Sequence, residues 1–373
     1  MSGVAGSGAQ LGSPALLVFG AIVRRDIGPL AFSLVACGIA ATVATFQFAI
    51  FTSFVAASAA APHFIAADAW ITDRGVACFD FPSPLPEGYD GPLAALLPGA
   101  RFDRVVMGFA SYVSPGGARG NVAVIGSDGS GLAPRTFRSD VSEAMRLGLD
   151  GGSEASIGGV TMQAAGTTDR LATYLGAPYA LLRYETAQAL LGMPADTGSY
   201  LAVHFPNGVP ADLKTRLARI EARYPEISAR TGAEFEASSA AYWQGKTGAG
   251  AAILLAAVLA SVLMALLLVN GIGRFVQRRE ADLVSMIGHG ASPGQLAVLL
   301  ALIGVLLVGA SLAQALVAVP LLDAVTAGWL PWVAFKPVDA GFALIVALLA
   351  FGVAIASATS ALRQFPPDAI FRS

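Results

Sequence analysis

Charged side chains are scarce in this chain: only 13% of its 373 residues are Asp, Glu, Lys or Arg. Soluble domains are about one quarter charged, whereas hydrophobic residues reach 55% here, so the composition indicates a membrane protein. The formal net charge of -2 gives no reason to expect nucleic acid as a partner.

Cysteine and histidine are rare as well. Cys37 lies in an apolar run and Cys78 in a polar segment, so we expect no internal disulfide. The three histidines, His63, His204 and His289, are scattered, and no His or Cys pair has metal-ligand spacing. The sequence therefore predicts neither a metal site nor a cofactor.

Motifs for ATP hydrolysis and for nucleophilic catalysis are missing too. Residues 245–247, Gly-Lys-Thr, match the end of a P-loop, but Ala240 stands where that loop needs glycine. The bulky Tyr242 and Trp243 would also block a phosphate-binding curl, so Lys246 is interpreted as an anchor at the membrane interface. No Gly-x-Ser-x-Gly elbow is present. We therefore expect no enzymatic activity, and any ATP hydrolysis would belong to a partner subunit.

Four long runs without any charged residue dominate the rest of the chain. A membrane span needs roughly 20 apolar residues, and each run is at least that long. Ser33, Cys37, Ala41 and Thr45 recur every fourth residue in the first run, which suits close helix packing, although the chain is alanine-rich throughout. The runs predict four spans, one before and three after a large polar segment.

The polar segment at 58–246 regains charge, proline and glycine, and it is long enough for a folded α+β domain. Pro210–Arg223 carries an apolar face at helical spacing, and Ile227–Arg230 follows as a strand, which indicates a β-α-β unit. Alternating apolar residues predict four further strands, the second and third joined by the turn Ser114–Gly117: Ala69–Thr72, Val105–Val113, Asn121–Ile125 and Tyr200–Phe205.

The orientation follows from the arginines of the short segments. Arg24, Arg25, Arg274, Arg278, Arg279, Arg363 and Arg372 would lie on one side, with only Lys336 in the short loop opposite. The positive-inside rule places both termini in the cytoplasm and the large domain outside the inner (plasma) membrane. Pro14–Ile27 reads as an amphipathic helix on the cytoplasmic leaflet, or equally as an extension of the first span.

A short charged segment, Arg274–Leu296, separates two of the apolar runs and must lie in water. At helical spacing Leu283, Met286 and Ile287 form a small apolar face, with Arg278, Arg279, Glu280 and Asp282 on the wet face. Gly288 and Gly290 end this helix, and Pro293 can open the next.

The chain resembles the MacB/FtsX-like permeases of ABC transporters. The shared plan is one span, a large outer domain and three spans. Arg278-Arg279-Glu280 precedes Gly288 with the spacing of that family's cytoplasmic loop, although Ala281 and His289-Gly290 depart from the usual residues. Pro367-Asp-Ala-Ile-Phe371-Arg372 keeps the proline and arginine of the family's C-terminal motif and replaces its leucine by Phe371.

The resemblance implies that Arg274–Leu296 is a coupling helix that docks on a separate ATP-binding subunit. Two permease copies would pair with two ATPases, and membrane lipid and an adaptor protein would be further partners. The alternative is an ordinary solvated loop that obeys the positive-inside rule. The residues implied to bind the ATPase are Arg278, Arg279, Glu280, Leu283, Met286, Ile287 and Gly288.

The expected function is the permease subunit of an exporter that transmits ATP-driven motion to its outer domain and exports a lipid, glycolipid or other envelope product. Residues 68–71 and 242–247 look most like the DevC-type branch. The alternative is an FtsX-like regulator of a cell-wall hydrolase. The expected division is a cytoplasmic N-terminus at 1–28, spans at 29–57, 247–272, 295–322 and 340–362, the outer domain at 58–246, the coupling loop at 273–294, an external loop at 323–339 and a cytoplasmic tail at 363–373.

Overall fold

A computed structural model describes residues 20, 25, 27–149, 151–169 and 171–363. The expected amphipathic helix at 14–27 and the C-terminal motif at 367–372 fall almost wholly outside these residues. The chain separates into two compact units. One takes the chain up to Phe51, Ala252–Val325 and the chain from Phe335 onward, and the other takes Thr52–Ala251 and Thr326–Ala334. The loop expected at 323–339 is therefore divided between the units.

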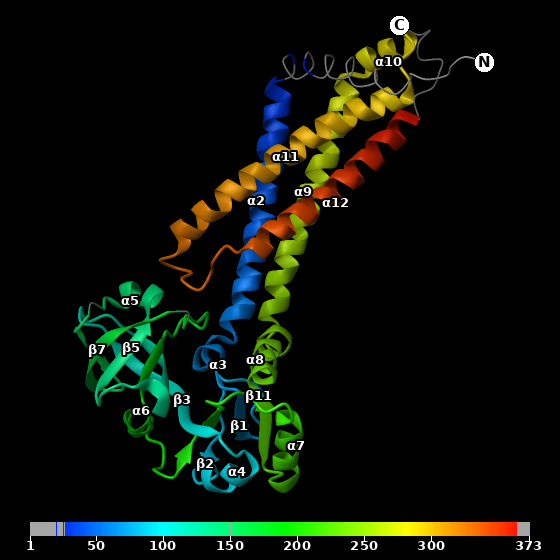
Figure 1. Cartoon of the computed structure of the whole chain (residues 1–373). Helices are drawn as coiled ribbons and strands as arrows, with labels where there is room; N and C mark the ends of the chain where they lie inside the picture. Colours follow the sequence, from blue (N-terminus) through cyan, green and yellow to red (C-terminus); the bar gives the residue numbers. More distant parts are fainter. Residues whose placement is uncertain (1–19, 21–24, 26, 150, 170, 364–373) are drawn as a thin grey trace. The chain divides into compact units, whose positions relative to one another are not determined.

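Among the described residues, four helices are long and apolar enough to cross a membrane (Figure 1). They are α2 (Ile27–Ala57), α9 (Ala249–Arg278), α11 (Pro293–Thr326) and α12 (Pro337–Arg363), with the short α10 (Glu280–Gly288) between α9 and α11. The expectation of four apolar helices is thus confirmed.

Two helices continue beyond the ends of the expected membrane spans. Helix α9 continues past Ile272, the end of the span expected at 247–272, to Arg278, and its residues Phe275 and Val276 are buried. Helix α11 begins at Pro293, as the sequence predicts, and extends past Leu322 to include Asp323.

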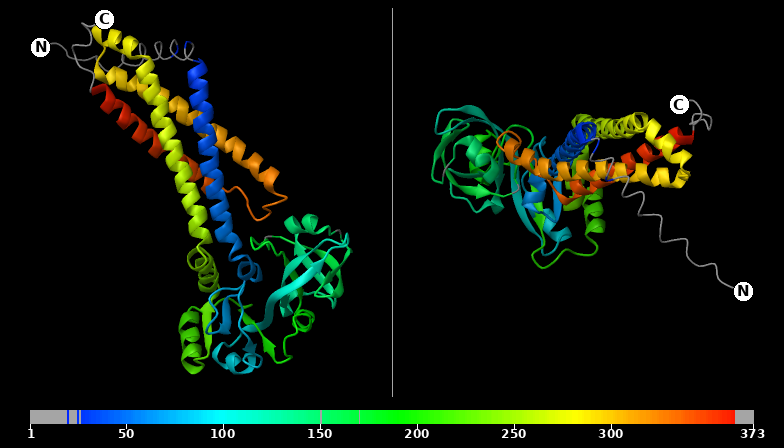
Figure 2. Two further views of the ribbon diagram at one scale, coloured as in Figure 1. Left: turned by 180° about the vertical axis from the view of Figure 1, so that it is seen from behind. Right: turned by 90° about the horizontal axis from the view of Figure 1, so that it is seen from above.

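Small residues let the apolar helices approach closely. A Cβ atom on Gly38 of α2 would lie 2.1 Å from the side-chain oxygen of Gln314 on α11. On Gly304 of α11 it would lie 2.8 Å from the ring of Phe351 on α12. In Figure 1 and in both views of Figure 2, α11 crosses α2 obliquely. Cys37, Ala41 and Thr45 of the small-residue stripe are buried, which fits their expected packing role.

The second unit, which we call the outer unit because the sequence predicts it outside the membrane, is built on one nine-stranded sheet with the order β11-β1-β10-β3-β4-β8-β5-β7-β6. Its longest strand, β3, also pairs with β6, so that six strands from β3 to β6 close into a small barrel. The strands are β1 (Ala69–Asp73), β3 (Arg101–Val113), β4 (Arg119–Ser127), β5 (Thr136–Asp140), β6 (Glu154–Ile157), β7 (Val160–Thr168), β8 (Tyr179–Arg183), β10 (Tyr200–His204) and β11 (Ile227–Thr231), with β2 (Leu85–Pro86) and β9 (Thr197–Gly198) as a separate pair.

The open half of the sheet contains the expected β-α-β unit. Strands β10 and β11 both run antiparallel to β1, which lies between them, and α7 (Leu213–Arg223) connects them. Leu213, Leu217 and Ile220 of α7 are buried, as their spacing predicts. The other helices are α3 (Ala60–Ile65), α4 (Asp90–Leu96), η1 (Asp128–Ser130), α5 (Val141–Leu147), α6 (Tyr184–Leu190), α8 (Gly232–Ala241) and the π-helical turn η2 (Tyr242–Lys246).

Three clusters of buried side chains fill this unit. One contains Val106, Tyr112 and Phe137 and fills the barrel. A second packs α4 and α7 on one face of the open half through residues such as Leu93 and Leu217. The third, which we call the Trp70 cluster, lies on the opposite face and includes Trp70, Phe79, Val105, Ile125, Tyr179, Leu181, Tyr200, Ala202 and Phe235.

We predict that Gly126→Ala destabilises the outer unit by overpacking. A Cβ atom at Gly126 of β4 would lie 2.3 Å from Ala187 Cβ and 2.7 Å from Val106 Cγ2, and neither neighbour has a flexible side chain. Overpacking of this kind costs about 1–3 kcal/mol in free energy of unfolding. The measurement is the midpoint of thermal unfolding of the full chain in detergent. Gly120→Ala, on the same strand with no atom within 4 Å, is the control. Equal midpoints for the two variants would contradict the packing described for β4 and α6.

Candidate functional site

The short helix α10 carries most of the residues expected to bind an ATPase. It connects the end of α9 to the start of α11 and belongs to the same compact unit as most of α9 and α11. Figure 1 shows α10 in yellow. Gly290, with φ of +88°, then makes the turn that leads to Pro293 at the start of α11. The sequence-predicted helix break at these glycines is confirmed.

One face of α10 is occupied by the chain itself. Leu283 is only 2% exposed and joins the core cluster of the apolar helices, and the half-buried Met286 and Ile287 pack against that cluster. Arg279, expected on the wet face, is 7% exposed, and its Nη1 donates to Asp282 Oδ2 at 2.5 Å. The expectation for Arg279 was wrong because α9 continues to Arg278, which turns Arg279 inward at the junction of the two helices.

The opposite face of α10 is open. Arg278, Glu280, Asp282, Ser285 and Gly288 are exposed, as is His289, whose Nδ1 lies 2.7 Å from the carbonyl oxygen of Ser285. A partner would therefore meet a polar, mainly charged surface, with Leu283 beneath it as an anchor. The assignment of the seven residues to ATPase binding stays a prediction, and Ser285 and His289 are surface residues that the apolar-face argument missed.

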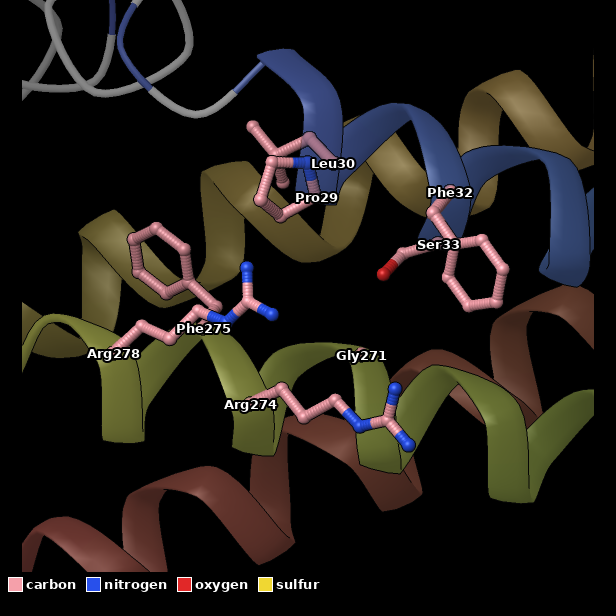
Figure 3. Close-up of a pocket in the computed structure, with 8 residues that line it drawn as sticks. All are labelled: Pro29, Leu30, Phe32, Ser33, Gly271, Arg274, Phe275 and Arg278. Atoms are coloured by element: carbon pink, nitrogen blue, oxygen red, sulfur yellow. The ribbon is translucent and has the colours of Figure 1, made fainter.

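A hollow of about 150 Å³ lies between α2 and α9 near the same segment. Figure 3 shows the Ser33 hydroxyl pointing from α2 towards α9, from which Arg274 and Arg278 extend. Pro29, Leu30, Phe32, Gly271 and Phe275 complete its lining. Two exposed arginines beside apolar side chains at the end of a span suit the phosphate layer of a membrane, as the positive-inside rule expects.

The turn η2, which precedes α9, is held in the outer unit by hydrogen bonds and ring contacts. Trp243 of η2 is buried, and its indole Nε1 donates to Asp80 Oδ2 at 2.8 Å. Tyr179 of β8 donates its hydroxyl to the other carboxylate oxygen at 2.6 Å, and the Tyr174 ring contacts Trp243 edge-on. Thr247 Oγ1 donates to the Trp243 carbonyl at 2.6 Å, so the Gly-Lys-Thr tripeptide forms the end of this turn. Asp80 and Tyr179 carry no signal in the sequence that distinguishes them from ordinary domain residues.

Burial dominates the electrostatics of this junction. Desolvation raises the pKa of the Asp80 carboxyl above its usual value, and the hydrogen bonds from Tyr179 and Trp243 oppose that rise only in part. Desolvation, with Asp80 nearby, also raises the pKa of the Tyr179 hydroxyl. The junction is therefore a hydrogen-bonded anchor in an apolar setting. Among the described residues, no group of three or more His, Cys, Asp or Glu residues could hold a metal ion.

Comparison with known proteins gives weak structural likenesses, among them those to domains of two transporters. No family model and no curated protein matches the chain. The periplasmic region of MacB from Actinobacillus actinomycetemcomitans is 10% identical, with a TM-score of 0.35 over 46% of this chain and 92% of that one. The extracellular domain of the noncanonic ABC-type transporter YknZ from Gram-positive bacteria is 10% identical, with a TM-score of 0.31 over 43% of this chain and 100% of that one. At these scores the likeness establishes neither family nor function, and the DevC-type assignment stays a prediction.

We predict that Asp80→Asn removes a pH dependence of stability. Because burial disfavours ionised Asp80, the folded chain holds this proton to a higher pH than the unfolded chain, whose Asp pKa is about 3.9. The free energy of unfolding should therefore fall as pH rises from about 4 through the raised pKa. Because the asparagine side chain is neutral at every pH, the variant should lose this decrease of the free energy of unfolding with rising pH. The measurement is the thermal midpoint of the full chain in detergent from acid to neutral pH, with the exposed Glu154→Gln as control. An unchanged slope in Asp80→Asn would contradict the assignment.

Proposed function

We propose that this chain is the permease subunit of an ABC-type exporter, in which α10 receives motion from a separate ATP-binding subunit. The single observation that carries the proposal is the two-sided character of α10, whose charged face is open while Leu283 is buried among the chain's own apolar helices. A helix held in this way passes a displacement to α9, α11 and α12, because packed cores shift as units.

The far end of α9 supports the same proposal. Three residues of α9, Ala249–Ala251, belong to the outer unit, and the turn just before them is hydrogen-bonded to buried Asp80. Force along α9 would reach a packed domain through these contacts. The described spans carry almost no ionisable groups away from their ends, so an energy source outside the membrane suits them better than ion coupling.

The partners in this proposal are two ATPase subunits, a second permease copy and an adaptor protein. The exported molecule would be a lipid, a glycolipid or another product of the cell envelope. The chain would lie in the inner (plasma) membrane with both termini in the cytoplasm. Arg278, Glu280, Ser285 and His289 would meet the ATPase, and Leu283, Met286 and Ile287 would hold α10 in place.

We predict that Glu280→Arg weakens association with the proposed ATP-binding subunit by about tenfold or more, because it reverses a charge on the docking face. Glu280 is exposed, so the thermal midpoint of the isolated chain should not change. The measurements are co-purification of the two proteins and ATP hydrolysis by the complex. Glu154→Arg, at an exposed position of strand β6, is the matched control. Loss of binding in both variants, or in neither, would refute docking at α10, and capture of a cell-wall hydrolase by the full chain would favour the regulator instead.

A labelling experiment tests the orientation. In intact cells a membrane-impermeant maleimide should fail to label Ser285→Cys on α10 and should label the exposed Thr161→Cys on β7. After permeabilisation Ser285→Cys should react, whereas Leu283→Cys should stay unreactive because its side chain is buried. The native Cys37 and Cys78 are buried and give a low background. Labelling of Ser285→Cys in intact cells would overturn the cytoplasmic position of α10.

A further inference from the structure

A cavity of about 300 Å³ opens beside the Trp70 cluster in the outer unit. It is larger than the hollow between α2 and α9, and it lies apart from α10 in the sequence and in the other compact unit. Its lining comes from seven elements and mixes charged, polar and apolar side chains: Phe64, Ile65, Arg101, Asp103, Ser127, Gly129, Ser130, Arg138, Leu181 and His204.

The strand registers place the charged residues on the face of the sheet that is apolar elsewhere. On β3, Arg101 and Asp103 alternate in phase with Val105, which belongs to the Trp70 cluster. His204 pairs with Arg101 across β10 and β3, and Arg138 pairs with Leu181 across β5 and β8. One face of the sheet therefore changes from a hydrophobic core to a charged surface within two residues along the strands.

Sheet protection does not account for this change. Inward-facing charges guard the outermost strands of a sheet against aggregation, but β3, β4 and β8 each have a neighbour on both sides. Asp103 is only 7% exposed and Ser127 only 6% exposed. Both buried groups have partners, because Asp103 lies beside Arg101 and His204, and Ser127 Oγ accepts a hydrogen bond from Gly129 N. A binding role for this face therefore depends on the side chains that remain without a partner.

The charge around the cavity is not balanced. Asp103 Oδ2 accepts from Arg101 Nη2 at 3.0 Å and lies 3.5 Å from His204 Nε2. The side chain of half-buried Arg138 makes no hydrogen bond or ion pair with any residue that the structure describes. Its guanidinium is thus available to an anion, and a guanidinium fork binds carboxylate or phosphate with two parallel hydrogen bonds.

The other wall of the cavity is apolar. Phe64 and Ile65 come from α3 and pack against the Trp70 cluster, and Leu181 projects from β8 next to Arg138. Helix α3 begins at Ala60, three residues after the apolar helix α2 ends at Ala57. A ligand that satisfies both walls needs an anionic group and a hydrocarbon part.

We infer that this cavity binds the headgroup of an anionic lipid, with its phosphate on Arg138 and the first carbons of its chains against Phe64, Ile65 and Leu181. Ser127 and Ser130 add hydroxyl groups at the cavity wall, and the Asp103 carboxylate holds Arg101 and His204 in place. The inference deepens the proposed function because it names the class of exported molecule. Binding of the lipid does not depend on that function, but its role as the exported substrate does.

The test uses the full chain in nanodiscs of phosphatidylcholine, with empty nanodiscs subtracted and no ATPase present. Calorimetry measures the affinity of the chain for three probes: dihexanoyl phosphatidic acid, glycerol 3-phosphate and dihexanoyl phosphatidylcholine. Phosphatidic acid should bind most tightly. Arg138→Gln should weaken its binding about tenfold to hundredfold, as expected for charge-assisted hydrogen bonds. Arg138→Lys should keep part of the affinity.

The controls separate the two halves of the ligand. Arg219→Gln, an exposed arginine on α7, removes the same charge and should leave binding unchanged. Phe64→Ser should weaken binding of phosphatidic acid more than that of glycerol 3-phosphate, with thermal unfolding as a check of the fold. Wild-type affinity in Arg138→Gln, or equal affinity for phosphatidylcholine, would overturn the site. Equal affinity for glycerol 3-phosphate and phosphatidic acid would contradict the assignment of a lipid as the ligand and would indicate a site for a soluble phosphate. Because the assay contains no ATPase, its result is independent of docking at α10.

Discussion

The pairing of strand β3 on both of its sides is the constraint on which the outer unit depends. Its first residues pair with β10 in the open half, and its last residues pair with β4 and β6 in the barrel. Because side chains alternate across a strand, β3 supplies Val105 to the Trp70 cluster and Val106 to the barrel core. A slip of one residue would exchange these two cores and would also turn Asp103 away from the cavity.

The apolar unit depends on a different kind of contact. Lipid is as apolar as leucine, so helices in a membrane gain little from hydrophobic burial and associate through close packing. The approaches at Gly38 and Gly304 provide that packing. Helix α10 is then held by the same cluster of side chains, through Leu283, and is part of the bundle rather than a loop attached to it.

Much of the fold can be read from the sequence because the signals are local. The four charge-free runs give the apolar helices, and alternation gives β1, β3, β4 and β10. Strand β7 was not predicted because Ala165 and Gly166 interrupt the alternation of exposed Thr161 and Gln163 with buried Met162 and Ala164, and its place is set by pairing with β5 and β6. The burial of Arg279 could not be predicted either, because the direction in which each side chain of α10 points depends on where α9 ends. The cavity could not be predicted at all, since Arg101, Arg138 and His204 meet only after the strands have paired.

The position of β1 in the sheet has a consequence for how the outer unit folds. Within the nine-stranded sheet β1 pairs only with β10 and β11, which are among the last strands of the domain to be synthesised. Contacts between segments so distant in the chain slow folding, because a long loop must close before they form. During synthesis the first strand, with buried Trp70 and Ile71, would stay unpaired until residue 204 has emerged, and it would gain its second neighbour only after residue 231. A nascent chain with such an unpaired apolar strand can aggregate for longer than a chain whose contacts are local. Binding of a chaperone to this strand during synthesis would therefore protect the chain.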